Sequence, residues 1–146
     1  MPEFRRPESI LVIVYTDDLQ VLLLKRVAPF EFWQSVTGSL QAGESPAAAA
    51  ERELLEETGL SADGRLIETG ISRTFTIDPR WRDRFAPGIT ENLEHEFHYR
   101  LPMPVDIVIN SEEHSEYQWV PDDQATELVW SWTNREALER LRIELV

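Results

Sequence analysis

Short apolar runs alternate with polar, turn-forming segments along most of the chain. The run from Ser9 to Tyr15 is apolar and rich in β-branched residues, which predicts a strand that is buried on both faces. The segment 16–18 follows as a turn, and Val21 to Arg26 predicts a second strand, so the two strands form a hairpin. Further strands are expected at 32–36, 66–69, 71–77, 94–101 and 117–120, and a long loop is expected at 78–88.

Helical signals flank the segment Ala47 to Thr58. Ser45 is suited to the N-cap, and Pro46 is suited to the first helical position, where its missing N–H costs nothing. Gly59 fits the left-handed residue that ends such a helix. The face that we expect to pack inward contains Ala47, Ala50 and Leu54.

A second helix is predicted from about Thr133 to Ile143, and a shorter helical turn is predicted after Pro121. Its expected core contacts are Leu138, Leu141 and Ile143. Strands mixed with two or three helices favour an α/β or α+β sandwich, and 146 residues without a linker or repeat favour one domain, 1–146.

The charge of the chain narrows the range of partners. There are 27 acidic and 14 basic residues, so the formal net charge is −13. Such a surface disfavours nucleic-acid polymers and anionic membranes as partners, but a phosphorylated small molecule can bind if a cation lies between the two. The absence of cysteine excludes disulfides, zinc–thiolate sites and cysteine nucleophiles. With no apolar run of membrane-spanning length and no signal-peptide pattern, we expect a cytoplasmic protein.

Five carboxylates lie between residues 44 and 57, and three of them share one face of the first predicted helix. These three are Glu53, Glu56 and Glu57, which are three and four residues apart. A solvated acidic face is the ordinary interpretation of such a stripe. However, like charges at this spacing repel, and a Mg²⁺ ion would convert the repulsion into binding because it prefers oxygen ligands.

The surrounding residues resemble the Nudix box, G-x5-E-x7-R-E-U-x-E-E-x-G-U, where U is aliphatic. From Gly38 to Leu60 every specified position matches, so the chain is identified as a member of the Nudix family. The resemblance implies a mixed β-sheet sandwiched between α-helices and a metal-dependent hydrolase that cleaves a phosphoric anhydride. It implies Mg²⁺, with Mn²⁺ as an alternative, on the catalytic carboxylates Glu53, Glu56 and Glu57. It gives structural roles to Gly38, Glu44, Arg52 and Gly59.

Outside the box, the chain resembles one branch of the family, whose members cleave dihydroneopterin triphosphate to the monophosphate and pyrophosphate in bacterial folate synthesis. The segments that carry this resemblance are 5–7, 32–39, 85–90, 113–119 and 131–135. It implies substrate contacts from Arg5, Arg26, Thr37 and Ser131, and a further catalytic metal ligand or base at Glu113. Arg6 is an alternative to Arg5, and Glu112 is an alternative to Glu113.

Two other functions stay open at this point. A general (d)NTP pyrophosphohydrolase acting, for example, on dATP would use the same chemistry with a different pocket for the base. A Nudix-fold binding domain without turnover is disfavoured because all the box carboxylates are present. The partner expected in each case is a small phosphorylated molecule, and the oligomeric state is not readable from the sequence.

Overall fold

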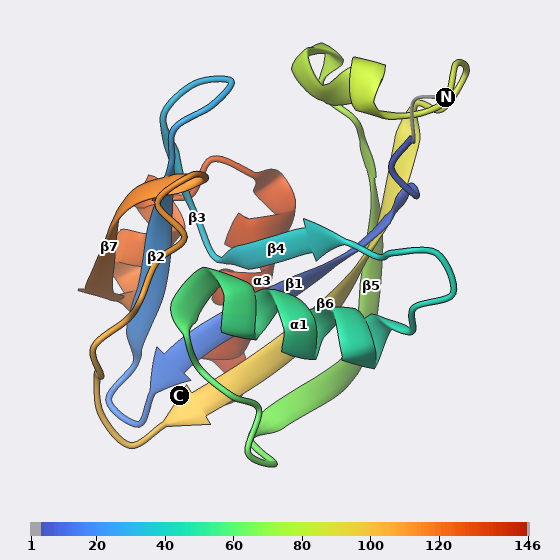
Figure 1. The fold of residues 1–146 in the computed structure, drawn as a ribbon. Coiled ribbons are helices and arrows are strands. Elements are labelled where there is room, and N and C mark those ends of the chain that lie inside the picture. The colour runs from blue at the N-terminus through green and yellow to red at the C-terminus, as the bar shows by residue number, and fades with distance from the viewer. Residues whose placement is uncertain (1–3, 146) are drawn as a thin grey trace.

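A mixed β-sheet lies at the centre of the molecule, with helices on both of its faces (Figure 1). The structure is a computed structural model that describes residues 4–145. Seven strands are described: β1 (Glu8–Thr16), β2 (Gln20–Arg26), β3 (Phe32–Gln34), β4 (Val36–Ser39), β5 (Leu66–Thr76), β6 (Glu91–Leu101) and β7 (His114–Pro121). The helices are α1 (Pro46–Thr58), the short 3₁₀ helix η1 (Pro79–Arg84), α2 (Asp122–Leu128) and α3 (Trp132–Leu145). The predicted mixed sheet between helices is confirmed.

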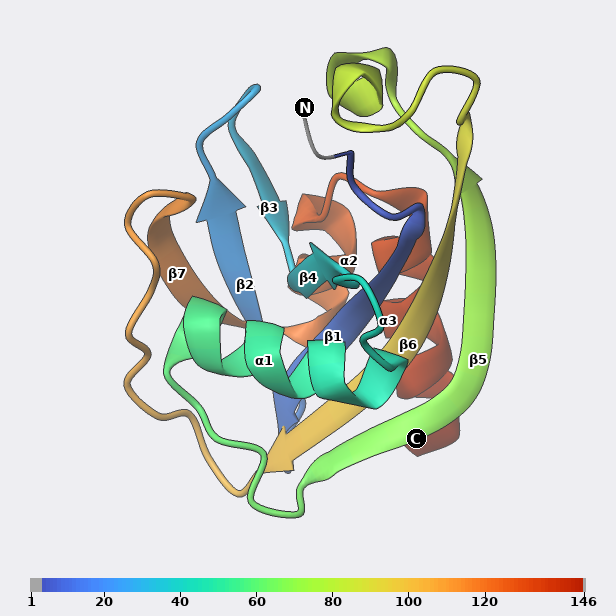
Figure 2. The same ribbon diagram turned by 45° about the vertical axis from the view of Figure 1, so that its right-hand side comes forward.

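The strand order is β3-β2-β1-β6-β5, with β4 pairing to β1 and β7 pairing to β2. Strands β1 and β6 are parallel, and the other pairs are antiparallel. The register of β1 with β2 covers only Tyr15 and Val21, whereas the first half of β1 pairs with β4. The two halves of the sheet therefore splay apart beyond the hairpin, as Figure 2 shows.

Strand β1 contributes to a hydrophobic core on each face of the sheet. Ile10 and Val12 pack with Leu54 of α1, whereas Leu11 and Ile13 pack with the residues of α2 and α3 on the other face. The prediction of a strand buried on both faces is confirmed, because β1 lies between layers of helices.

Two expected core contacts are wrong. Ala47 is exposed because it lines a surface groove beside Leu66 and Glu68, and Ala49 is buried in its place. Ile143 is 76% exposed, although Leu138 and Leu141 are buried as predicted. At about 100° per residue, a position two residues after Leu141 points to the opposite side of the helix.

The strand predicted at 32–36 is divided in two at Ser35. The backbone N–H of Ser35 donates to Asn134 Oδ1 at 2.8 Å, and Asn134 Nδ2 donates to Ser35 Oγ at 3.0 Å. Both residues are buried, so Asn134 takes the place of a strand partner at this point. The chain can then leave the edge of β2 as β3 and continue beside β1 as β4.

The segments predicted at 66–69 and 71–77 form one strand, β5, with an irregular register between Glu68 and Ser72. Gly70 lies in this interval at φ +79°, which is a conformation that glycine adopts easily. The predicted loop at 78–88 contains η1, which begins where the Asp78 carboxylate accepts a hydrogen bond from the Arg80 N–H at 2.9 Å.

The ends of α1 are confirmed. The Ser45 side chain accepts a hydrogen bond from the Ala48 N–H, and Gly59 ends the helix at φ +78° with its N–H bonded to the Leu55 carbonyl. None of the helices within residues 4–145 is long and apolar enough to cross a membrane.

Adjacent leucines on α1 provide a test of this packing. Leu54 is fully buried between helix and sheet, and Leu55 is 55% exposed. We expect Leu54→Ala to lower the free energy of unfolding by about 2–5 kcal/mol, because it leaves a cavity. The matched control Leu55→Ala should change it by less than about 0.5 kcal/mol in the same denaturant titration. Similar losses in both variants would contradict the orientation of α1.

Candidate active site

Arg52 ties the loop before α1 to the helix. Its Nε and Nη2 donate to the two carboxylate oxygens of Glu44 at 2.9 and 3.0 Å, and Nη2 also donates to the Ser39 carbonyl at 3.1 Å. Glu44 also accepts a hydrogen bond from the Gln41 N–H at 2.9 Å. The hydrogen bonds from Arg52 lower the pKa of Glu44, against the effect of burial. These contacts fit the structural roles that the resemblance gives to Glu44 and Arg52.

Glu53 lies between this network and the backbone of β4. Arg52 Nη1 donates to Glu53 Oε1 at 2.7 Å and to Glu56 Oε2 at 3.3 Å. A Cβ at position 38 would overlap the Glu53 carboxylate, so the glycine allows the close approach. Burial raises the pKa of Glu53 to about 7, although Arg52 opposes this shift. The side chain of Glu56 is half exposed.

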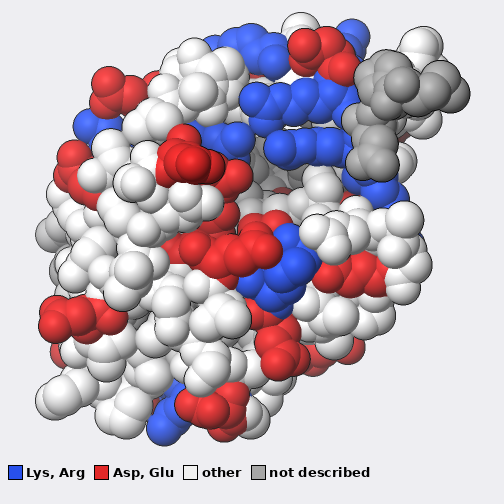
Figure 3. Space-filling view, viewed as in Figure 1, with Lys and Arg blue, Asp and Glu red and all other residues white. Residues whose placement is uncertain are grey.

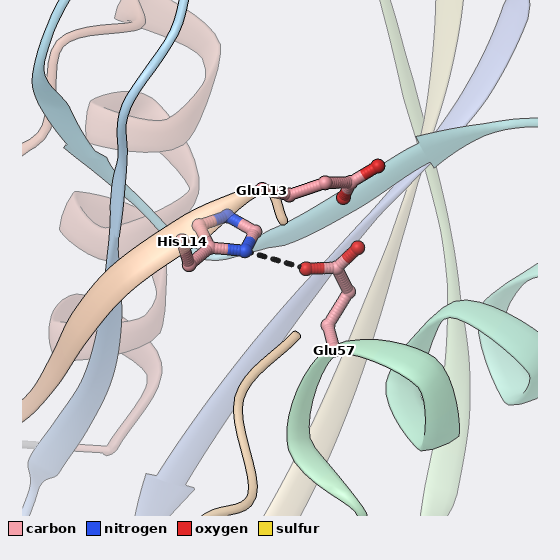
Figure 4. A group of neighbouring side chains, drawn as sticks. All are labelled: Glu57, Glu113 and His114. Carbon is pink, nitrogen blue, oxygen red and sulfur yellow. Dashed lines mark ion pairs between the residues drawn. The ribbon is translucent and has the colours of Figure 1, made fainter. Parts of the chain in front are cut away.

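Three side chains converge beside the last turn of α1 (Figure 4). They are Glu57 from α1, Glu113 from the loop before β7 and His114 from the first position of β7, and one ligand atom from each lies within 4.8 Å of the others. Glu57 and His114 are almost fully buried. The sequence pattern predicted Glu57 and Glu113 but gave no role to His114. Glu112 is exposed, and it is not part of this group.

The polar atoms of this group are not fully satisfied. Glu57 Oε2 approaches His114 Nδ1 to 2.7 Å, yet the two atoms are not aligned as a hydrogen bond, and both remain buried without another partner. The Gln34 amide nitrogen lies 3.1 Å from His114 Nε2. If this amide donates, the proton of the neutral ring lies on Nδ1, the ring nitrogen that lies nearest to Glu57.

Electrostatics also favour a cation at this position. Burial raises the pKa of Glu57, and so does the neighbouring Glu113 carboxylate, whose own pKa is lowered by the hydrogen bond from Glu57. The charged form of Glu57 is therefore disfavoured unless a cation lies close to it. Burial lowers the pKa of His114 to about 4, so the imidazole supplies no positive charge at neutral pH. Neighbouring carboxylate oxygens, one of them buried and unsatisfied, fit a hard divalent cation, which would stabilise their charged forms.

A cavity of about 480 Å³ opens where the two halves of the sheet splay apart. Its wall includes all four predicted substrate contacts, Arg5, Arg26, Thr37 and Ser131, together with Gly38 beside Glu53. Thr37 Oγ1 donates to the Ile10 carbonyl, and Ser131 Oγ is bonded to Thr133. Arg6, the alternative to Arg5, does not line the cavity and instead donates to Glu8 and to the Glu44 carbonyl.

The cavity wall has a basic part and an aromatic part. Arg5 and Arg26 form the basic part. The pKa of Arg5 is lowered by desolvation and by the neighbouring cations of Arg84 and Arg26. Figure 3 shows basic side chains around a hollow, with acidic side chains below it at the level of α1. A trianionic or tetra-anionic phosphate chain would bridge these two charged regions if a divalent cation bound the acidic one.

Phe32, Trp81 and Trp130 line another part of the wall, and together with Phe30 they form an aromatic cluster that sequence reasoning missed. Phe30, Phe32, Trp81 and Trp130 have ring centroids 4.8–5.9 Å apart. The Arg80 guanidinium lies 4.0 Å from the Phe30 centroid. In the sequence, the local sign that Trp81 could belong to a binding site is its position between Arg80 and Arg82. Flat apolar surfaces of this kind suit a heterocyclic ring.

Comparisons with known proteins agree with this architecture. A family model described as the NUDIX domain matches residues 5–141. The chain is 40% identical over 144 residues to dihydroneopterin triphosphate diphosphatase of Escherichia coli K12, which covers 96% of this chain and 95% of that protein. It is 35% identical over 149 residues to the Haemophilus influenzae protein of the same name, which covers 99% of this chain and 93% of that protein.

Solved structures give the same result. The structure of the Escherichia coli dihydroneopterin triphosphate pyrophosphohydrolase matches with a TM-score of 0.89 and 40% sequence identity, covering 97% of this chain and 98% of that chain. Together with the box geometry on α1, these matches show that the chain belongs to the Nudix family.

Proposed function

We propose that this Nudix hydrolase cleaves dihydroneopterin triphosphate to the monophosphate and pyrophosphate. The observation that carries the proposal is one cavity whose wall holds arginines and aromatic rings, with the carboxylates of α1 close behind it: Glu53 lies against Gly38 of the wall, and Glu57 lies near Arg26. This arrangement suits a molecule with a polyphosphate chain and a flat ring. The relatives with 40% and 35% identity, named for this activity, support the choice of substrate.

The carboxylates would hold the metal. Glu57 and Glu113 are the oxygen donors of the cluster, Glu53 lies one helical turn before Glu57, and His114 Nδ1 lies 2.7 Å from Glu57 Oε2. When bound, Mg²⁺ or Mn²⁺ would neutralise charge on the phosphates and lower the pKa of a coordinated water. Glu56 is the third proposed ligand on α1; its side chain is half exposed and accepts a hydrogen bond from Arg52.

The other residues bind and orient the substrate. Arg5 and Arg26 bind phosphate oxygens, because a guanidinium fork matches two such oxygens. A carboxylate of the cluster accepts a proton from the attacking water, the new oxygen–phosphorus bond forms, and the bridging bond to pyrophosphate breaks. Thr37 and Ser131 line the cavity with small hydroxyl side chains next to the ring.

Substrate preference is the first test. A pocket built for the pterin should give kcat/KM for dihydroneopterin triphosphate at least about tenfold above that for dATP, which corresponds to about 1.4 kcal/mol. Initial rates with pyrophosphate as the detected product measure this ratio. Equal efficiencies would support a general nucleotide hydrolase and would leave the chemistry of the site intact.

Removing one charged ligand tests the metal site. Glu57→Gln keeps the size of the side chain, and we expect kcat at saturating Mg²⁺ to fall about a hundredfold or more while circular dichroism shows a folded protein. Glu51→Gln removes the same charge from an exposed position of α1 and is the matched control. If Glu57→Gln were as active as the control, Glu57 would not be a ligand.

The role of Arg26 is separable from that of the metal. An interaction of similar strength in the ground and transition states contributes to KM, so Arg26→Ala should raise KM roughly tenfold or more with a smaller change in kcat. The exposed Arg140, at the other end of the chain, provides a control with the same loss of charge. An unchanged KM in Arg26→Ala would remove this residue from the phosphate site.

A further inference from the structure

Glu94 is a buried carboxylate that the proposed chemistry does not use. It lies on β6, lines the cavity and is only 6% exposed, and its Oε1 has no hydrogen-bond partner. A few other buried side-chain atoms within residues 4–145 also lack a partner, but none of them belongs to a residue of the cavity wall. An acceptor of this kind suits a ligand that donates a hydrogen bond.

The surrounding protein leaves Glu94 Oε1 without a hydrogen bond, although the charge of Arg73 lies close to it. Arg73 lies opposite it in the β5–β6 register. Arg73 Nη1 donates to Glu96 at 2.6 Å and Nε donates to Glu136 at 2.9 Å, whereas Nη2 is buried without a partner and makes no hydrogen bond to Glu94. Burial raises the pKa of Glu94 to about 7, although a hydrogen bond with Thr133 and the charges of Arg73 and His95 oppose the shift. An ionised Glu94 is therefore costly to the folded protein unless a donor reaches it.

We propose that Glu94 Oε1 accepts a hydrogen bond from an N–H of the substrate ring, and that Glu94 selects rings with an amino-oxo edge, in which a ring N–H lies between an amino-bearing carbon and a carbonyl. Such an edge, found in pterins and guanine, presents its amino group next to a ring N–H, so it offers adjacent donors. Adenine presents its amino group next to a bare ring nitrogen, whose lone pair a carboxylate repels. The inference rests on the proposed function, because it takes the ring to lie among the aromatic residues of the same cavity.

The exchange Glu94→Gln tests this selection. The amide keeps the size but offers both a donor and an acceptor, which suits the mixed edge of adenine. At pH 8 we expect kcat/KM to fall at least about tenfold for dihydroneopterin triphosphate and for dGTP, and to change less than about threefold for dATP. Glu91→Gln, an exposed position on the same strand, should leave all three values unchanged. A uniform fall, or no change, with all three substrates would overturn the inference.

Using dGTP separates this inference from the choice of substrate. If dihydroneopterin triphosphate is a poor substrate but the preference for dGTP over dATP is lost in Glu94→Gln, the proposed function fails and the role of Glu94 holds. If dihydroneopterin triphosphate is preferred equally by wild type and variant, the proposed function holds and the role of Glu94 fails.

Thermal unfolding distinguishes ligand recognition from a structural pairing with Arg73. Because the pKa of Glu94 is raised on folding, its unfavourable contribution is present above about pH 7 and is lost as the pH falls toward 4.5. The charged groups around it are Arg73 on β5, Glu96 and His95 on β6, and Glu136 of α3, which is bonded to Arg73. Glu94→Gln should thus have a Tm equal to or above wild type at pH 8, with a smaller difference at pH 5. A lower Tm at pH 8 with unchanged substrate preference would assign Glu94 to the Arg73 network and overturn the inference.

Discussion

Buried carboxylates at the end of α1 impose the constraint around which the active site is built. Burial and the neighbouring Glu113 raise the pKa of Glu57, and Glu53, one turn earlier, accepts a hydrogen bond from Arg52. Carboxylates are retained in such a place only when something compensates their desolvation. Arg52 offsets part of the charge from one side, and it is itself fixed by Glu44 and by the Ser39 carbonyl. A divalent cation on the cavity side would offset the rest.

The splayed sheet opens the cavity next to this cluster, because Gly38 of the cavity wall lies against Glu53. Because β1 pairs with β2 only near their hairpin, β4 can lie against β1 while β3 stays on β2, and the space between the halves becomes the cavity. The Ser35–Asn134 hydrogen bonds hold the chain at this division. The unpartnered Glu94 oxygen in the cavity wall lowers the stability of the free protein. Such a loss is expected where a residue serves ligand binding and not folding.

Sequence reasoning succeeded where the signals are local. The capping residues of α1 and the box from Gly38 to Leu60 lie within a short segment, so their geometry follows from helical spacing. It failed where distant segments meet. Asn134 lies 99 residues from Ser35, and the aromatic cluster joins the 30–32 segment with Trp81 and Trp130. In the sequence, Glu94 is indistinguishable from the other acidic residues of its strand. Its burial and its unpartnered oxygen become visible only when the strands and helices are packed together.

The central claim, that the buried carboxylates of α1 and the β7 loop form a divalent-cation site, is tested most directly by thermal unfolding without substrate. A ligand that binds only the folded state at about a hundred times its Kd adds about 2.7 kcal/mol to stability. For a chain of this size the Tm should therefore rise by roughly 5–10 °C with saturating Mg²⁺ or Mn²⁺. NaCl at the same ionic strength should not produce this rise, and Glu57→Gln should lose most of it. A wild-type Tm that does not respond to divalent cations, or a response equal in both proteins, would contradict the account.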